Sequence, residues 1–156
     1  MQEKIIEQFW LRAKKAAGIG SDAGYQSCFA FGGNDILADE LGQLVASGVK
    51  TATASGYKSY AIQHEPLPAT GGFDIVLGSQ RPLAVISNEL VSVVKFADVD
   101  AQQAYLEGEG DRSLAYWRQA HEAFFKEDFK ADGLTFSYDS DIVLERFRLV
   151  YAERLR

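Results

Sequence analysis

Residues 82–96 have the sequence PLAVISNELVSVVKF, and this stretch decides the fold class. It is rich in Val, Ile and Leu, and its two halves, 82–87 and 89–96, could form one long bent strand. Residues 73–77 are also β-rich, and the alternation over 141–151 suits a strand with one face mostly buried. The runs at 73–77, 82–87 and 89–96 together predict an antiparallel sheet.

Helices are predicted before and after these strands. Apolar residues recur at helical spacing over residues 2–17 and 37–45, and Asn34 is placed to cap the second helix. A further helix capped by Asp111 runs to about Lys130, with an apolar face made of Leu114, Trp117, His121, Phe124 and Phe125. Helices among short strands, without a regular βαβ rhythm, indicate an α+β protein with a small closed or half-closed barrel.

Composition limits the classes of function. The 156 residues, 47% hydrophobic and 24% charged, fit a single domain over 1–156, with residues 1–20 as an N-terminal helical extension. The net charge of −6 opposes charge-driven coating of nucleic acid, although it is compatible with a local basic cleft. The single cysteine, Cys28, favours a reducing cytoplasm, and no apolar run approaches the ~18 residues of a membrane helix. We therefore expect a cytoplasmic location and no membrane partner.

A lysine beside two threonines follows the second helix, in the segment GVKTAT at 48–53. A buried lysine with a lowered pKa can act as a base, and a nearby threonine can act as a nucleophile. Residues three apart point to opposite faces of a regular strand, so Lys50 and Thr53 converge only if the backbone bends. The alternative is a solvated lysine followed by an ordinary strand and a turn at Ser55-Gly56.

The acidic segment EGEGDRSL at 107–114 is the second candidate for chemistry. Neighbouring carboxylates raise one another's pKa, which suits acid–base work, and the glycines allow close approach of a ligand. The alternative is that Asp111 caps a helix while Glu107 and Glu109 lie in a solvated turn. His121 is expected to be a core or boundary residue, and with His64 as the other histidine we expect no metal and no organic cofactor.

These two segments and their surroundings resemble the ASCH domain family. The likeness covers nearly the whole chain from Phe31 onward, and its motifs are GVKTATAS at 48–55, EPLP at 65–68, EGEGDRSL at 107–114 with Trp117 and HEAFF at 121–125, and ERF at 145–147. The resemblance implies a PUA-like β-barrel with helices packed around it. It also implies a cleft for RNA or for nucleotide-like ligands.

The resemblance also suggests residues for a reaction. Small members of the family hydrolyse the amide of N4-acetylcytidine with a lysine, a threonine and a glutamate, and another member is a ribonuclease. By motif match these residues are Lys50, Thr53 and Glu109, and Glu107 stays an alternative because the glutamate match needs a one-residue gap. Ser55 stands where the small hydrolases have an arginine, and this departure weakens the substrate assignment.

The sequence therefore predicts a protein that binds RNA or a modified nucleoside in a cleft of the barrel, with hydrolysis as a candidate activity. Lys50, Thr53 and Glu109 should line one pocket if they act together. The expected substrate-binding residues are Thr51, Ser55, Tyr57 and Phe31, the last two by stacking on a base. The main alternative is a noncatalytic RNA-binding module, and a structural or protein-partner role comes third.

Overall fold

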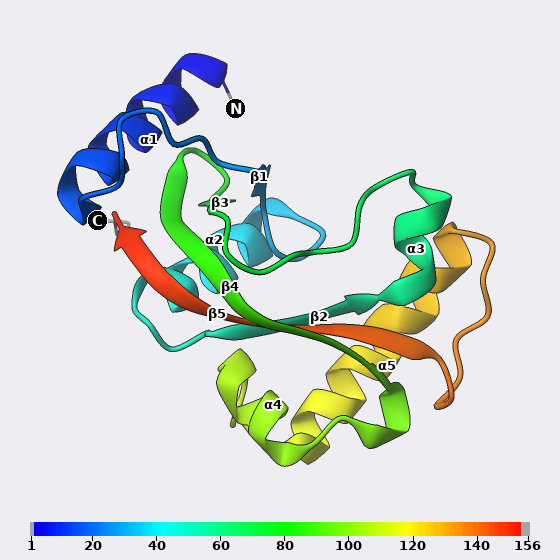
Figure 1. The fold of residues 1–156 in the computed structure, drawn as a ribbon. Helices are drawn as coiled ribbons and strands as arrows, with labels where there is room; N and C mark the ends of the chain where they lie inside the picture. The colour runs from blue at the N-terminus through cyan, green and yellow to red at the C-terminus, as the bar shows by residue number, and fades with distance from the viewer. Residues whose placement is uncertain (1, 154–156) are drawn as a thin grey trace. The chain divides into compact units, whose positions relative to one another are not determined.

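A computed structural model describes residues 2–153 (Figure 1). The chain contains five helices and five strands within these residues, together with a short 3₁₀ turn at Phe96–Asp98. Their order is α1 (Glu3–Ala17), β1 (Ser27–Phe29), α2 (Asp35–Ala46), β2 (Ala52–Gly56), α3 (Tyr57–Ile62), β3 (Asp74–Leu77), β4 (Pro82–Lys95), α4 (Ala101–Glu107), α5 (Leu114–Ala131) and β5 (Asp141–Ala152). The predicted mixture of helices and strands is confirmed. None of the helices in the described part is long and apolar enough to cross a bilayer.

The strands form one five-stranded sheet in the order β1-β3-β4-β5-β2. The run at 82–95 is a single strand, as the sequence predicts. The predicted antiparallel pairing is confirmed for β3 and β4, and β2 also pairs with β5 antiparallel. The short strand β1, which lies outside the runs of that prediction, pairs with β3 in parallel. Parallel pairing requires a crossover, and the long connection through α2 and β2 between β1 and β3 provides it.

The chain divides into two compact units, and both long strands contribute residues to each. The first unit contains residues 2–51, 70–89 and 147–153 of the described chain. In this unit α1 buries Phe9, Trp10 and Ala13 against Ile75 and Val85. A second cluster places Val45 of α2 with Phe31, which follows β1, and with Val76 of β3, Ala84 and Ile86 of β4 and Phe147 of β5. The apolar side chains of both helices therefore pack against the sheet.

The second unit contains residues 52–69 and 90–146, and its core is built on α5. Trp117, Phe125 and Phe129 of this helix pack with Phe96, Val99, Ala104, Ile142 and Leu144. Phe124, expected on the buried face, is 48% exposed, because the helix turns its Phe125 side toward the core instead. The helix also begins later than predicted: Ser113 is its N-cap and accepts from the Tyr116 amide, while Asp111 accepts from the Ser113 amide.

The predicted turn at Ser55-Gly56 is the end of strand β2. Ser55 pairs with Val143 and Gly56 with Ile142, so partner residues almost ninety positions away extend the strand through a sequence that favours turns. Gly56 then adjoins α3, and a Cβ added there would lie 2.5 Å from Cε1 of Phe129. The glycine is needed for this close approach of strand and aromatic ring.

Candidate functional site

The predicted site residues are divided between the two units. Phe31, Lys50 and Thr51 belong to the first unit, and the boundary falls directly after Thr51. The second unit contains the remaining candidates, which are Thr53, Ser55, Tyr57, Glu107 and Glu109. The shared pocket of Lys50, Thr53 and Glu109 stays a prediction.

Lys50 is placed by the end of α2. Gly48 has a left-handed φ of 79°, and the amides of Val49 and Lys50 both donate to the Leu44 carbonyl, at 2.9 and 3.0 Å. The Lys50 residue is 2% exposed, and its Nζ lies 5.2 Å from the centroid of the Phe31 ring. The alternative of a solvated lysine is thus wrong. A charged group is rarely buried this far unless it has a specific role or partner.

The threonine segment leaves the first unit along strand β2. The Thr51 carbonyl accepts a hydrogen bond from the Phe147 amide at 2.9 Å, which places the start of the strand beside β5. Thr53 lies opposite Glu145 in the antiparallel pairing. Further along, the hydroxyl groups of Ser55 and Tyr60 are 2.7 Å apart, and burial raises the pKa of Tyr60. Ser55 is thus joined to α3.

The acidic segment forms the end of α4 and the turn after it. Asp100 caps this helix by accepting from the Gln103 amide, and Gly108 ends it in a left-handed conformation, with φ of 75°. Glu107 is therefore the last helical residue, and it is 1% exposed, whereas Glu109 in the turn is half-buried. The expectation of a solvated turn is wrong for Glu107. The two glutamates have different environments despite being two residues apart.

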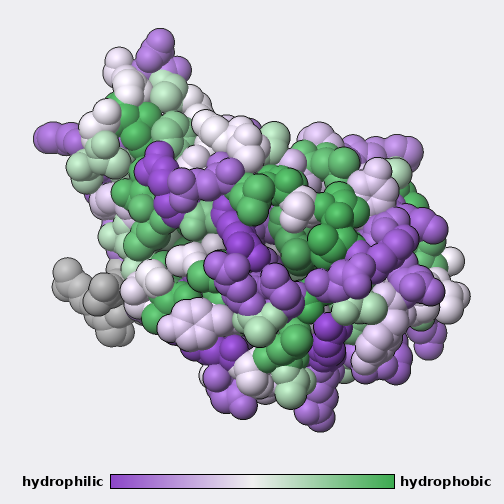
Figure 2. Space-filling model, turned by 60° about the horizontal axis from the view of Figure 1, so that its bottom comes forward, coloured by the Kyte–Doolittle hydropathy of each residue, from purple (hydrophilic) through white to green (hydrophobic). Residues whose placement is uncertain are grey.

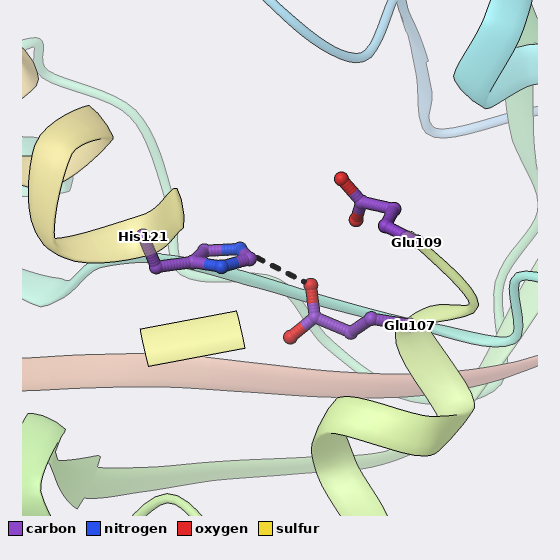
Figure 3. Close-up of side chains that lie close together, drawn as sticks. All are labelled: Glu107, Glu109 and His121. Carbon is purple, nitrogen blue, oxygen red and sulfur yellow. Dashed lines mark ion pairs between the residues drawn. The ribbon is translucent and has the colours of Figure 1, made fainter. Parts of the chain in front are cut away.

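Glu107 is held by three neighbouring side chains. Its Oε2 accepts hydrogen bonds from Trp117 Nε1 at 2.6 Å and from Gln103 Nε2 at 3.2 Å. Its Oε1 lies 3.4 Å from His121 Nε2, a contact that is an ion pair when the imidazole ring is doubly protonated (Figure 3). The two donors to Oε2 offset part of the cost of burying the carboxylate and orient it.

His121 is oriented by its own helix. Its Nδ1 is 2.9 Å from the Trp117 carbonyl oxygen, which can only accept, so Nδ1 carries a proton in this contact and Nε2 faces Glu107. The imidazole ring stacks on the Trp117 indole with centroids 4.1 Å apart and 14° between planes. The His121 side chain is 14% exposed, which confirms its expected place at the boundary of the core.

Glu107, Glu109 and His121 point toward one another in Figure 3, from the end of α4, the following turn and α5. Each offers one ligand atom, and these atoms all lie within 4.8 Å of one another. Carboxylate oxygen and imidazole nitrogen are donors that zinc or manganese ions accept, so these three residues are the ones in the described chain that could hold a cation. Glu107 and His121 also contact each other, and they contact Trp117.

Sequence reasoning missed Gln103 as part of this site. The residue is completely buried, and its amide contacts the Thr53 carbonyl, the Glu107 carboxylate and the Arg146 guanidinium, each at 3.2 Å. Its position four residues before Glu107 places both on one face of α4, which is the local signal that could have identified it. The contacts with Thr53 and Arg146 have no local signal.

A surface depression of about 420 Å³ lies beside α3 in the second unit. Its lining includes Tyr57, which is 38% exposed, together with Lys58, Tyr60, Ala61, Ile62, Glu65, Leu67 and Leu134. Over the face shown in Figure 2, hydrophobic side chains occur in small groups between hydrophilic ones. Tyr57 is thus accessible, unlike Phe31, whose exposure is 9%.

The helices and the single five-stranded sheet define the class of this protein, an α+β domain. The family model of the ASCH domain matches residues 27–151. The chain therefore belongs to the ASCH domain family, which confirms the resemblance seen in the sequence.

Solved structures agree with this assignment. The crystal structure of an ASCH domain from Lactobacillus crispatus JV V101 superposes with a TM-score of 0.88 at 28% identity, over 96% of both chains. A protein of Enterococcus faecalis V583 has a TM-score of 0.85 at 34% identity, over 96% of this chain and 90% of its own. An ASCH protein variant from Zymomonas mobilis, at 12% identity, has a TM-score of 0.50 over 72% of this chain and 64% of its own, and shows the fold alone. No curated protein sequence matches the chain significantly.

Proposed function

We propose that this protein binds an RNA base or a modified nucleoside and hydrolyses an acyl amide on the base, using Lys50, Thr53 and Glu109. The observation that supports this most directly is the burial of Lys50, which is 2% exposed and separated from Thr53 by only two residues. Removing an ammonium group from water costs free energy, so such a position favours a chemical role over a solvated one.

In the proposed reaction Lys50 accepts the proton of the Thr53 hydroxyl group. The Thr53 oxygen then attacks the acyl carbonyl, the carbon–nitrogen bond breaks, and Glu109 gives a proton to the departing amino group. Water then attacks the acyl carbon of the Thr53 ester and gives a proton to Glu109. The bond between this carbon and the Thr53 oxygen breaks, Lys50 returns its proton to that oxygen, and the carboxylic acid leaves. Glu109 suits the role of acid better than Glu107, because it is half-buried while both oxygens of Glu107 already contact protein side chains.

Base recognition in this proposal uses residues near the two ends of β2. Tyr57 is 38% exposed beside the depression at α3, so its ring can stack on an unpaired base. Thr51 and Ser55 supply hydroxyl groups along the same strand, and Phe31 lies against the Nζ of Lys50. Stacking with a few hydrogen bonds is how proteins usually read single bases.

The decisive experiment is a screen of the purified protein against N4-acetylcytidine, other acylated nucleosides and short RNAs. We expect release of an acyl group from at least one nucleoside, and loss of that turnover in Lys50→Ala. Lys126→Ala is the matched control, because this lysine is exposed on α5, and it should retain full activity. Salt-sensitive RNA binding without turnover of any compound would instead support a noncatalytic RNA-binding module. Cleavage of RNA would support a ribonuclease, and either result would overturn the amide hydrolysis.

A further inference from the structure

Gln103 is a buried polar residue whose amide reaches both the Thr53 backbone and the Glu107 carboxylate. It lies in the middle of α4 with none of its surface exposed. A buried amide must satisfy its donors and its acceptor within the protein, because a buried polar group left without a partner destabilises the fold. Gln103 does so with three contacts to α4, β2 and β5.

The orientation of the Gln103 amide follows from the chemistry of its partners. The Thr53 carbonyl and the Glu107 carboxylate only accept hydrogen bonds, so the group that contacts both must be the NH₂. Arg146 Nε only donates, so the atom it contacts must be Oε1. A flipped amide would break all three contacts, and the arrangement therefore has a single solution.

The amide joins the two parts of the proposed site that lie in the second unit. One N–H reaches the backbone of β2 at Thr53, and the other reaches the carboxylate at the end of α4. Arg146 anchors the opposite end of the amide and also lies 3.9 Å from Asp100, the N-cap of α4. The amide thus links the Thr53 strand to the end of α4.

We propose that Gln103 is a positioning residue, which holds Thr53 and the Glu107–Glu109 turn in the relative placement that the reaction needs. The effect of Gln103 on the reaction rests on the proposed function. Gln103 has no role in the reaction beyond these contacts, since its surface is fully buried and both ends of its amide are used by protein groups. Small errors in placement of reacting groups are costly in rate, which is why a positioning residue affects kcat.

The test is Gln103→Glu, which keeps the shape and removes the NH₂ donors. The new carboxyl group would face the carboxylate of Glu107 and the carbonyl of Thr53, with Arg146 as its counter-ion, so the contacts to Thr53 and Glu107 would be lost. Gln102→Glu is the matched control, because it introduces the same charge at the neighbouring, exposed position of α4. Gln103→Asn is a second variant, one methylene shorter, for the case in which Gln103→Glu does not fold.

Two NMR signals of the ligand-free protein report on how Thr53 and Glu107 are held. The indole N–H of Trp117 donates to Glu107, and the chain has two tryptophans, so its signal is readily assigned. The amide of Ala54 belongs to the same peptide group as the Thr53 carbonyl. We expect both signals to shift in Gln103→Glu and in Gln103→Asn, while the indole signal of Trp10 and both signals in Gln102→Glu stay unchanged. Unshifted Trp117 and Ala54 signals in a folded Gln103 variant would overturn the proposal.

Turnover tests the catalytic consequence separately. On the nucleoside that the screen identifies, we expect kcat to fall at least about tenfold in the Gln103 variants with little change in KM, as for loss of one well-placed hydrogen bond. An unchanged kcat in variants whose resonances have shifted would overturn the positioning role. A wild-type protein that turns over no compound would overturn the proposed function, and the two resonances would still decide whether Gln103 holds Thr53 and Glu107 in place.

Discussion

Trp117 Nε1 donates a 2.6 Å hydrogen bond to Oε2 of Glu107, and both residues are almost completely buried. The tryptophan is ten residues beyond the glutamate, on a different helix, so this bond ties α5 to the end of α4. The same indole ring stacks on His121. Trp117 is therefore both a core residue and a support of the candidate site.

Replacing Trp117 should destabilise the protein, and by more in Trp117→Ala than in Trp117→Phe. Trp117→Ala should lower the free energy of unfolding by about 3–5 kcal/mol through lost burial and a cavity. Trp117→Phe keeps a ring but removes the N–H donor to a buried carboxylate, and should cost about 1.5–3 kcal/mol. Urea unfolding measures both. Phe124→Ala, at a position 48% exposed on the same helix, should change the stability by less than about 1 kcal/mol. Equal losses in all three variants would contradict this assignment.

Gly56→Ala should destabilise the junction of β2 and α3. The added Cβ would meet Cε1 of Phe129 at 2.5 Å, and this ring is held in the core of the second unit. Overpacking of this kind costs about 1–3 kcal/mol. Gly24→Ala is the control, because a Cβ there meets no atom within 4 Å. Thermal unfolding of the two variants should differ clearly, and a Gly56→Ala protein as stable as Gly24→Ala would disprove the close contact.

Acid should remove the contribution of the Arg12–Glu153 ion pair. The hydrogen bond from the Arg12 guanidinium is the main cause that lowers the pKa of Glu153 below its ordinary value of 4.5. A carboxyl group whose pKa is lowered by folding stabilises the protein above its unfolded pKa, and loses this effect as the pH falls through the folded pKa. Since Arg12 is half-exposed, we expect Glu153→Gln to cost about 0.5–1 kcal/mol at pH 7. The difference from wild type should disappear below the folded pKa in unfolding curves recorded at several pH values.

Lys50→Arg separates a base from a phosphate anchor. As a base, Lys50 cannot be replaced by a guanidinium group, which does not lose its proton in the working pH range, so turnover should be abolished while much ligand affinity is kept. As an anchor, arginine would keep most of the binding, and affinity would fall as salt is added. We expect the first result for acylated nucleosides. A folded Lys50→Arg protein with wild-type turnover would exclude Lys50 as the base, and Lys126→Arg controls for the substitution itself.

Local sequence patterns predicted many features of the fold correctly. Asn34 caps α2 by accepting from the Leu37 amide, and residues 82–95 form one strand. Such features depend on neighbours within a few residues, which a single sequence displays directly. The family motifs also directed attention to Lys50 and the two glutamates, and family membership is confirmed.

Tertiary structure alone decided the environment of these residues. The burial of Lys50 and Glu107, the exposure of Phe124 and the strand pairing of Ser55 with Val143 all differ from what local pattern favoured. Gln103 is the clearest case, because two of its three partners, Arg146 and Thr53, lie 43 and 50 positions away in the sequence. Hydrogen bonds between such distant residues form only when folding brings the helices and strands together. The sequence by itself therefore determined most of the elements, the family and the candidate reactive residues, whereas packing determined which of these residues are buried and which side chains hold them.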